Sequence, residues 1–275
     1  MKNIALMFAA GIMAMSAYSA DIGYTTLISH RGESHDAPEN TLAAFKMAVS
    51  RGFGFECDVY LSKDGKVFSF HDSNLSRTTG GANKKRCNEV TWDEISKLDV
   101  GSWGHWAGSK FKGARPALLE EILALAKNGR WIFVEVKTGP EIVPYIADIV
   151  NKQRKGTKDN VLFISFNAKT CAALKEALPK YKVLLVTSGN GKDGTVQGIL
   201  ERLKDCKADG VDVHFKSKIV TPESVNEIRK AGYEFHVWTV DKLKDTLKAF
   251  KCGVQTVTTN CAKKQLDEYN KSKKK

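Results

Sequence analysis

Short runs rich in β-branched and aromatic residues alternate along this 275-residue chain with helical patterns. The runs that predict strands are Thr26–His30, Gly54–Tyr60, Trp131–Val136, Val161–Ser165, Val183–Thr187, Gly210–His214, Glu234–Thr239 and Gln255–Thr258. Apolar residues three and four positions apart predict helices between them, such as Thr41–Val49, Leu118–Ala126, Ala168–Leu178, Val196–Leu203, Pro222–Ala231 and Leu243–Phe250. Eight strand-and-helix repeats predict an α/β fold, the (β/α)8 TIM barrel. An open, doubly wound sheet is the alternative, because the sequence does not reveal whether the sheet closes.

The first 20 residues have the pattern of a secretory signal peptide. Lys2 supplies a positive start, Ile4 to Met15 form an apolar stretch too short to span a bilayer, and Ala17 to Ala20 offer small residues for cleavage. An N-terminal membrane anchor is the alternative. We expect residues 21–275 to form one barrel-sized domain in the periplasm or outside the cell.

The alternation is broken once, after the second predicted strand. Residues 55–61 and 66–71 flank the turn Lys63-Asp64-Gly65, which predicts a β-hairpin whose return strand carries His71 back toward the second strand. The stretch from about residue 73 to 115 has no barrel pattern beyond a short helix near its middle. We expect an insertion over one end of the barrel, where long loops of such folds bind ligands.

The formal net charge is +12, with 43 Lys and Arg against 31 Asp and Glu. The lysines are dispersed over the predicted helices, and only Lys271 and Lys273 to Lys275 form a run. A dispersed charge is typical of a solvated surface, so we expect no nucleic-acid partner. The charge would attract an anionic substrate or favour peripheral contact with an anionic membrane surface.

Six cysteines follow the signal-like segment, and none has the spacing of a zinc site. They are Cys57, Cys87, Cys171, Cys206, Cys252 and Cys261. An exported protein can pair an even number of cysteines, but a chain with 42% hydrophobic residues has an adequate core without disulfides. We expect at most one or two disulfides, with Cys57 a buried thiol in a strand.

Two acids two residues apart, Glu56 and Asp58, lie in the second predicted strand and therefore project from the same face. At the carboxyl end of a barrel strand, where active sites gather, such a pair indicates a divalent cation. A surface ladder of acids is the alternative, but the apolar neighbours Phe53, Phe55 and Val59 argue against exposure.

Glu135 and Lys137 repeat this geometry at the end of the third predicted strand. Glu135 would complete a carboxylate triad with Glu56 and Asp58, and Lys137 would contact a phosphate oxygen as a point charge. A salt bridge between Glu135 and Lys137 is the alternative interpretation. The acids at the equivalent level of the neighbouring strand favour the site.

His30 and His71 each end a predicted strand beside these acids. Arg31 follows His30, and Gly32 lets the backbone turn away from the rim. Two imidazoles near a bound cation suit proton transfer on a phosphodiester, one taking a proton from the attacking oxygen and one giving a proton to the leaving alkoxide. The pattern does not assign these two roles. The remaining histidines are interpreted as structural: His35, His105, His214 and His236.

These residues lie in ordered motifs that together resemble the glycerophosphodiester phosphodiesterase family. The motifs include His30-Arg31-Gly32, Pro38-Glu39-Asn40-Thr41, Glu56-Cys57-Asp58-Val59, His71-Asp72, Arg77-Thr78-Thr79-Gly80, Glu135-Val136-Lys137 and Val237-Trp238-Thr239-Val240. They cover nearly all of the chain after the signal-like segment. The resemblance implies a barrel whose insertion follows the His-Asp motif.

The resemblance also implies roles for individual residues. The implied metal ligands are Glu56, Asp58 and Glu135, the implied acid–base pair is His30 and His71, and the implied substrate contacts are Arg31, Lys137 and Trp238. For Trp238, packing at the rim is the alternative. One departure is Thr258-Thr259-Asn260, where family members often have an Asp after Thr, and this puts in doubt any role for an acid at the last strand.

We therefore expect an enzyme that uses one divalent cation to hydrolyse glycerophosphodiesters to glycerol 3-phosphate and an alcohol. Oxygen ligands suit Ca²⁺ or Mg²⁺, and export favours Ca²⁺. One alternative is a phospholipase D-like enzyme of the same superfamily acting on intact or lyso-phospholipids, which would need Trp103, Trp106 and Phe111 on a membrane-facing insertion. The other alternative is a non-catalytic binding protein of the cell envelope, which the loss of an acid or histidine would indicate.

Overall fold

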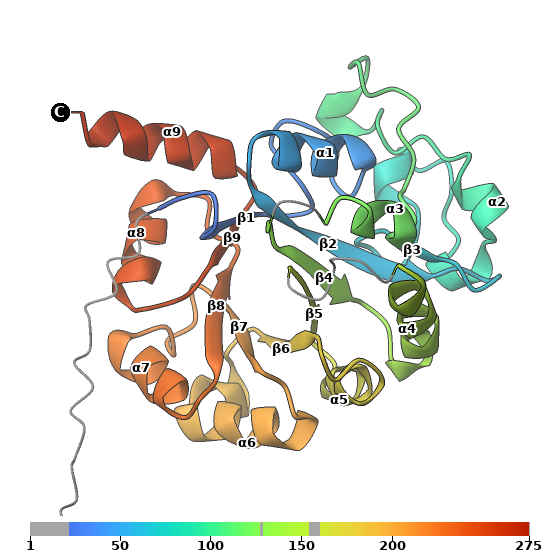
Figure 1. The fold of residues 1–275 in the computed structure, drawn as a ribbon. Helices are drawn as coiled ribbons and strands as arrows, with labels where there is room; N and C mark the ends of the chain where they lie inside the picture. Colours follow the sequence, from blue (N-terminus) through green and yellow to red (C-terminus); the bar gives the residue numbers. More distant parts are fainter. Residues whose placement is uncertain (1–21, 127–128, 154–159, 275) are drawn as a thin grey trace, which may run out of the picture.

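The computed structural model describes residues 22–126, 129–153 and 160–274. Within these ranges the strands are β1 (Leu27–Ser29), β2 (Gly54–Leu61), β3 (Val67–Ser69), β4 (Ile132–Val136), β5 (Val161–Ser165), β6 (Lys182–Thr187), β7 (Gly210–His214), β8 (Glu234–Trp238) and β9 (Val257–Thr259). They form one sheet in the order β1-β9-β8-β7-β6-β5-β4-β2-β3, and β1 also pairs in parallel with β2. This last pairing closes the parallel strands into a barrel (Figure 1). The predicted TIM barrel is confirmed, and the open doubly wound sheet is excluded.

Helices lie around the outside of the barrel (Figure 1). They are α1 (Leu42–Ser50), α2 (Trp92–Ile95), α3 (Leu119–Leu123), α4 (Val143–Lys152), α5 (Ala168–Ala177), α6 (Val196–Cys206), α7 (Pro222–Lys230), α8 (Leu243–Lys251) and α9 (Ala262–Ser272). The side chains of Thr41, Asn167 and Thr221 each accept a hydrogen bond from a backbone N–H in the first turn of α1, α5 and α7, which defines where these helices begin.

One helical prediction needs correction. α3 ends earlier than predicted, because the N–H groups of Leu125 and Ala126 bond three residues back and tighten the chain into turns. Helices α4 and α9 follow β4 and β9, where the eight repeats predict helices for which no bounds were given. Both carry an apolar face toward the barrel, with Ile146 and Leu266 buried.

The hairpin after β2 forms as predicted. β2 and β3 are antiparallel, with Val59 opposite Ser69 and Leu61 opposite Val67. Gly65 in the turn has φ +81°, a left-handed conformation that favours glycine. The N–H of Phe70 donates to the carbonyl of Asp58 over 3.1 Å, so the return strand brings His71 beside the acids of β2.

The insertion between β3 and α3 packs beside the hairpin (Figure 1) and has a small apolar core of its own. That core contains Phe68, Phe70, Leu75, Cys87, Val90, Ile95 and Val100. The aromatic side chains of the insertion are packed within it. Trp106 is buried and makes an edge-to-face contact with Phe111, and the Arg77 guanidinium lies over the ring of Trp103. The insertion is therefore a packed unit rather than an open loop.

Alternate residues of each strand face opposite layers of the fold. In β4, Val134 and Val136 pack between the strands and the helices, whereas Phe133 packs inside the barrel with Leu162 and Leu184. Glu135 consequently points into the barrel. All six cysteines are buried free thiols, and Cys57 faces the outer layer as predicted.

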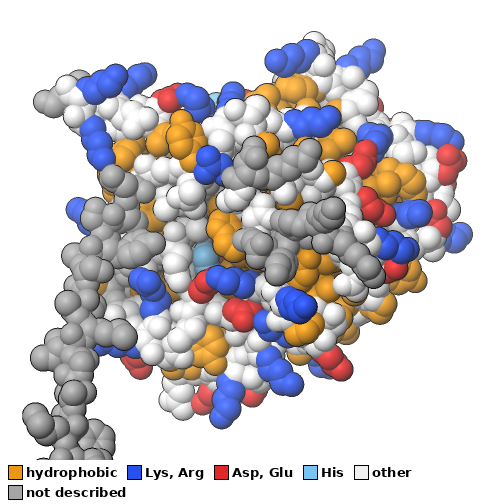
Figure 2. Space-filling view, viewed as in Figure 1, with side chains coloured by type: hydrophobic (Ala, Val, Ile, Leu, Met, Phe, Trp, Pro, Cys, Tyr) orange, Lys and Arg blue, Asp and Glu red, His pale blue; other side chains and the backbone are white. Residues whose placement is uncertain are grey.

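The predicted signal peptide lies outside the described residues. No helix within the described ranges is long and apolar enough to cross a bilayer. On the face shown in Figure 2, Lys and Arg side chains are spread among acidic and neutral ones. This view agrees with the dispersed charge expected from the sequence.

Candidate active site

The carboxyl ends of the parallel strands surround a cavity of about 290 Å³. Its lining residues are His30, Arg31, Glu56, His71, Glu135, Lys137, Ile164, Phe166, Val186, Asp212, Trp238, Thr239 and Thr258. The structure thus brings together every site residue predicted from the sequence except Asp58, which is buried directly beside Glu56 and Glu135.

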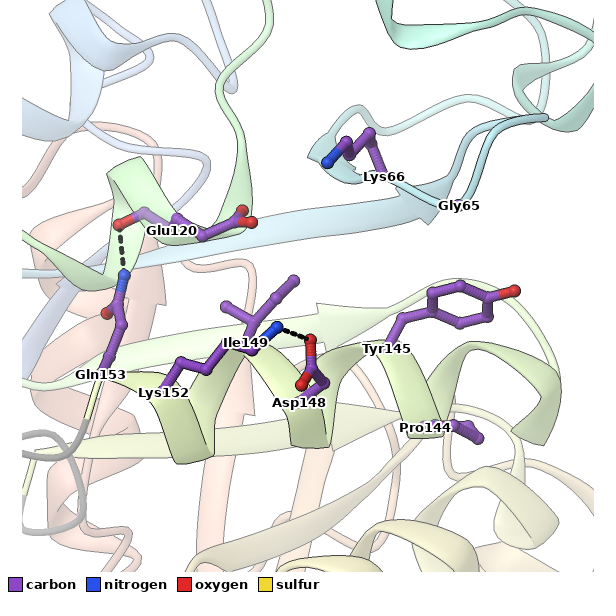
Figure 3. Close-up of a pocket in the computed structure, with 9 residues that line it drawn as sticks. All are labelled: Gly65, Lys66, Glu120, Pro144, Tyr145, Asp148, Ile149, Lys152 and Gln153. Carbon is purple, nitrogen blue, oxygen red and sulfur yellow. Dashed lines mark hydrogen bonds and ion pairs between the residues drawn. The ribbon is translucent and has the colours of Figure 1, made fainter.

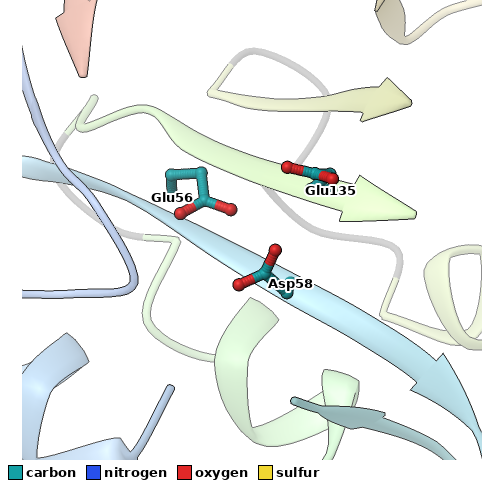
Figure 4. A group of neighbouring side chains, drawn as sticks. All are labelled: Glu56, Asp58 and Glu135. Atoms are coloured by element: carbon teal, nitrogen blue, oxygen red, sulfur yellow. The ribbon is translucent and has the colours of Figure 1, made fainter. Parts of the chain in front are cut away.

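Three carboxylates from two neighbouring strands form a cluster (Figure 4). In the pairing of β2 with β4, Asp58 lies opposite Glu135, and Glu56 lies two residues earlier on the same face. The three side chains point toward one another (Figure 4). One oxygen from each carboxylate lies within 4.8 Å of the others, and all three residues are buried. Burial and the neighbouring carboxylates raise the pKa of Glu56 well above its usual value and that of Glu135 to about 7.

Two cations partly compensate this cluster. The Nζ atom of Lys137 lies 2.7 Å from Glu135 Oε1 and 3.2 Å from Asp58 Oδ1, and Arg31 Nε lies 3.5 Å from Asp58 Oδ2. Although burial alone would raise the pKa of Asp58, Lys137 and Arg31 hold it below its usual value. The salt bridge considered from the sequence is present, and Lys137 lines the cavity as well.

The local backbone explains how Arg31 reaches this position. Arg31 has φ +56°, and its backbone N–H donates to Glu56 Oε2 over 2.8 Å. Gly32 follows with φ +79°, where a Cβ would lie 2.6 Å from the backbone of Ala44. Only glycine fits this close approach of the rim to α1.

A chain of polar contacts orients His30. Its Nδ1 lies 2.7 Å from Asn260 Oδ1, and Asn260 Nδ2 donates to Asp241 Oδ2 over 2.7 Å. Because a carboxylate only accepts, the Asn260 amide nitrogen must face Asp241 and its oxygen must face His30. His30 therefore carries its proton on Nδ1, and Nε2 is unprotonated. Burial, reinforced by Arg31, lowers the pKa of His30 to about 4.

His71 has the opposite kind of partner. Its Nδ1 lies 2.7 Å from Asp72 Oδ1, and Arg77 holds Asp72 from the other side through Nε over 2.7 Å. Although burial alone would raise the pKa of Asp72, Arg77 and His71 lower it to about 2. His71 therefore has a charged partner, whereas the amide of Asn260 offers His30 no charge.

Several residues of the site were not predicted from the sequence. Asn40 has φ +56° and holds Asp58 twice, donating from Nδ2 over 2.8 Å and accepting the Asp58 N–H over 3.1 Å. Glu39 accepts from both Arg31 and Arg77. The motif Pro38-Glu39-Asn40-Thr41 was the available signal, because these side chains are brought to the rim by the turn before α1.

An aromatic group forms the other wall of the cavity. Trp238 makes edge-to-face contacts with Phe166 and His214, and its Nε1 donates to the carbonyl of Asp212 over 3.2 Å. Phe166 is 46% exposed at the mouth. Trp238 is therefore both packed at the rim and available to a ligand, so the two interpretations from the sequence are compatible.

A second cavity, of about 430 Å³, lies outside the barrel between the hairpin turn and α4 (Figure 3). Lys152 bonds Asp148 over 2.6 Å, whereas Glu120 Oε2 is buried without a hydrogen-bond partner among the described residues. Gln153 donates to the carbonyl of Glu120. No catalytic constellation lines this cavity among the described residues, so the smaller cavity is the candidate active site.

Comparison with known proteins agrees with this geometry. The sequence pattern of the glycerophosphoryl diester phosphodiesterase family matches residues 30–264. A glycerophosphodiester phosphodiesterase of Caldanaerobacter subterraneus subsp. tengcongensis is 32% identical over 240 residues, covering 86% of this chain and 94% of the relative. One of Bacillus subtilis strain 168 is 27% identical, covering 85% and 82%.

Solved structures give the same result. The fold matches a phosphodiesterase of Oleispira antarctica, solved in complex with the product sn-glycerol-3-phosphate, with a TM-score of 0.79 and 28% identity. The match covers 89% of this chain and 96% of that one. The closed barrel, the cavity at its rim and these matches agree, and the chain belongs to the glycerophosphoryl diester phosphodiesterase family.

Proposed function

We propose that this protein hydrolyses glycerophosphodiesters to glycerol 3-phosphate and an alcohol, with a divalent cation held by Glu56, Asp58 and Glu135. The observation that carries the proposal is the buried carboxylate triad lying in one cavity with two histidines. The product bound to the Oleispira antarctica relative supports the same substrate class.

The triad fits a cation by the chemistry of its oxygens. Glu56 Oε1 is buried and has no hydrogen-bond partner among the described residues, and Asp58 Oδ1 has only the ion pair with Lys137 over 3.2 Å. Unpaired buried carboxylate oxygens are costly, and a bound cation would offset that cost. Oxygen ligands suit Ca²⁺ or Mg²⁺, and we favour Ca²⁺ because the N-terminal sequence predicts export. When bound, such a cation supplies Lewis-acid polarisation of a phosphoryl oxygen.

We assign different roles to the two histidines on the basis of their hydrogen-bond partners. His30, with Nδ1 protonated toward Asn260, presents the unprotonated Nε2 as the base that takes the proton of the attacking oxygen. His71, with Nδ1 bonded to the Asp72 carboxylate, is the acid that gives a proton to the leaving oxygen. Arg31 and Lys137 would bind the phosphate oxygens.

Hydrolysis of small diesters is favoured over hydrolysis of intact lipids. The lipid alternative requires the aromatic residues of the insertion to face a membrane. In the fold, Trp106 packs on Phe111, and Trp103 lies under the guanidinium of Arg77. These contacts use the aromatic surfaces within the protein. We also propose that the protein acts in the periplasm or outside the cell, which N-terminal sequencing of the native protein would test.

The decisive experiment measures hydrolysis of a panel of glycerophosphodiesters and lysophospholipids with and without chelator. We expect glycerol 3-phosphate from the small diesters, loss of activity with chelator, and recovery on adding Ca²⁺ or Mg²⁺. Full activity in the presence of chelator would refute the proposed requirement for a divalent cation. Turnover of lysolipids alone would favour the phospholipase alternative.

A further inference from the structure

A buried acid on the side of the cavity away from the carboxylate triad has no role in the reaction described above. Asp212 lies in the middle of β7, three strands along the sheet from β4, and lines the cavity with 1% of its surface exposed. Its Oδ1 atom has no hydrogen-bond partner among the described residues. It is not part of the cluster of potential metal ligands, which contains only Glu56, Asp58 and Glu135.

The surroundings of Asp212 make this arrangement costly. Ile164 and Val186 line the cavity between the triad and Asp212, and both belong to the apolar core inside the barrel. Elsewhere, buried acids have a cationic partner: Glu33 bonds Arg51 and Asp193 bonds Arg202. An unpaired carboxyl among apolar side chains destabilises a fold, and burial, with a further contribution from the charge of Glu135, raises the pKa of Asp212 well above its usual value.

A second residue that lines the same cavity has a polar atom without a partner. Thr258, on β9, is 2% exposed and lines the cavity, and its Oγ1 has no hydrogen-bond partner among the described residues. The next residue, Thr259, is fully paired, since its hydroxyl contacts Asp241 and Gln265. Unpartnered polar groups directed into a cavity indicate a polar ligand group that completes them.

The chemistry of this subsite selects a hydroxyl rather than a phosphate. An acid repels a phosphate, which Arg31 and Lys137 attract on the other side of the cavity. The carboxyl Oδ1 can accept a hydrogen bond from a hydroxyl in either protonation state of Asp212. When the phosphate lies beside the triad, the glycerol hydroxyl farthest from the phosphate is the one able to reach Asp212 across the apolar side chains of Ile164 and Val186.

We propose that Asp212, assisted by Thr258, binds the terminal hydroxyl of the substrate's glycerol group and so selects glycerol diesters over other phosphodiesters. This inference rests on the proposed function. Asp212 accepts from that hydroxyl, and the Thr258 hydroxyl completes the contact. The apolar surroundings of Asp212 make the selection for this hydroxyl strong, because a substrate without it leaves the buried carboxyl unpaired.

The test compares two substrates with the same leaving group: the p-nitrophenyl phosphodiesters of glycerol and of propane-1,2-diol. The second lacks only the terminal hydroxyl and keeps the one beside the phosphate ester. We expect wild-type kcat/KM to be roughly 10- to 100-fold higher for the glycerol diester. Asp212→Leu should reduce this preference to near unity by lowering kcat/KM for the glycerol diester alone.

Further variants separate recognition from a structural role. Asp212→Asn, which keeps an acceptor oxygen, should retain part of the preference, and Thr258→Val should weaken it. Thr78 is another buried threonine whose Oγ1 has no partner, but it does not line this cavity, so Thr78→Val is the matched control and should leave the preference unchanged. Asp212→Leu should also raise Tm, because it removes an unpaired buried carboxyl.

Each outcome has one meaning. A wild-type enzyme that cleaves both diesters equally well would overturn the proposal, and this result does not depend on whether any variant folds. Equal losses on both substrates in Asp212→Leu would also overturn it. If the wild-type protein cleaves neither substrate nor any glycerophosphodiester, the proposed function itself fails.

Discussion

The two halves of the barrel rim differ in how their side chains are satisfied. Strands β1 to β4 and the residues just after them supply the charged half: His30, Glu56, Asp58, His71, Glu135 and Lys137. Strands β5, β6 and β8 supply Ile164, Val186 and Trp238 to the same cavity. The charged half has groups that are satisfied only together and with a cation, whereas Ile164, Val186 and Trp238 of the apolar half are stable by packing. Asp212 on β7 is the exception in the apolar half, because its Oδ1 has no partner among the described residues. One half is therefore suited to the reaction and the other to the shape of the substrate.

The largest expected effect removes a charge from the triad. Glu56→Gln or Asp58→Asn should lower kcat roughly 10³-fold and weaken cation binding, because a ligand to the cation is lost. Isothermal titration with Ca²⁺ or Mg²⁺ and steady-state kinetics measure the two effects. Glu201→Gln, an exposed acid on α6, is the matched control. Unchanged cation affinity in both triad variants would refute the assignment.

The histidines should affect turnover but not the cation. His30→Ala and His71→Ala should each lower kcat by roughly 10²–10⁴ on a natural glycerophosphodiester while cation affinity stays nearly constant. A p-nitrophenyl leaving group needs little protonation, so it should restore His71→Ala and not His30→Ala. The exposed His35, varied to Ala, is the control. Rescue of His30→Ala instead would reverse the proposed roles.

Asn260 tests whether a residue of the charged half acts through His30. Asn260→Leu should lower kcat/KM roughly 10- to 100-fold, because the tautomer of His30 is no longer fixed. Asn260→Asp should raise the pKa of His30, since a carboxylate favours the imidazolium, and should move the acidic limb of the pH profile of kcat/KM to higher pH. Identical pH profiles for wild type and Asn260→Asp would exclude this role.

The apolar half should respond through substrate binding. Phe166→Ala at the mouth should raise KM a few-fold for diesters with a large alcohol and leave kcat nearly unchanged, because it removes contact area and no reacting group. Tyr145, which is similarly exposed at 44% but lines the outer cavity, supplies the control Tyr145→Ala. A larger loss of kcat than of affinity would place Phe166 in the reaction itself.

The smallest effect concerns the pH dependence of stability. The pKa of Glu135 rises from 4.5 to about 7 on folding, so the native state binds more protons than the unfolded state between these values. The free energy of unfolding of the chelated protein should therefore fall as pH rises from about 4.5 to 7. Thermal unfolding should show a weaker fall in Glu135→Gln and in protein saturated with cation. If the free energy of unfolding has the same pH dependence in the chelated wild type, in Glu135→Gln and in cation-saturated protein, repulsion among the triad carboxylates does not raise the pKa of Glu135.

Much of this protein was predictable from local patterns. The two-residue spacing of Glu56 and Asp58, their position at the end of an apolar run and the turn at Gly65 identify a strand, a shared face and a hairpin. Each of these signals depends on residues within a few positions of one another. For the same reason the alternation of strands and helices predicts the barrel, and the ordered motifs predict the family.

Only the tertiary structure decided which distant residues meet. Asn260 contacts His30 across 230 positions because β9 pairs with β1, and Asp212 faces the cavity because its strand lies across the closed barrel. Closure also determines burial, and burial lowers the pKa of His30 and leaves Asp212 without a partner. A sequence lists the groups that can ionise or donate. Their solvation and their partners depend on the closed barrel, and these decide the roles we propose for them.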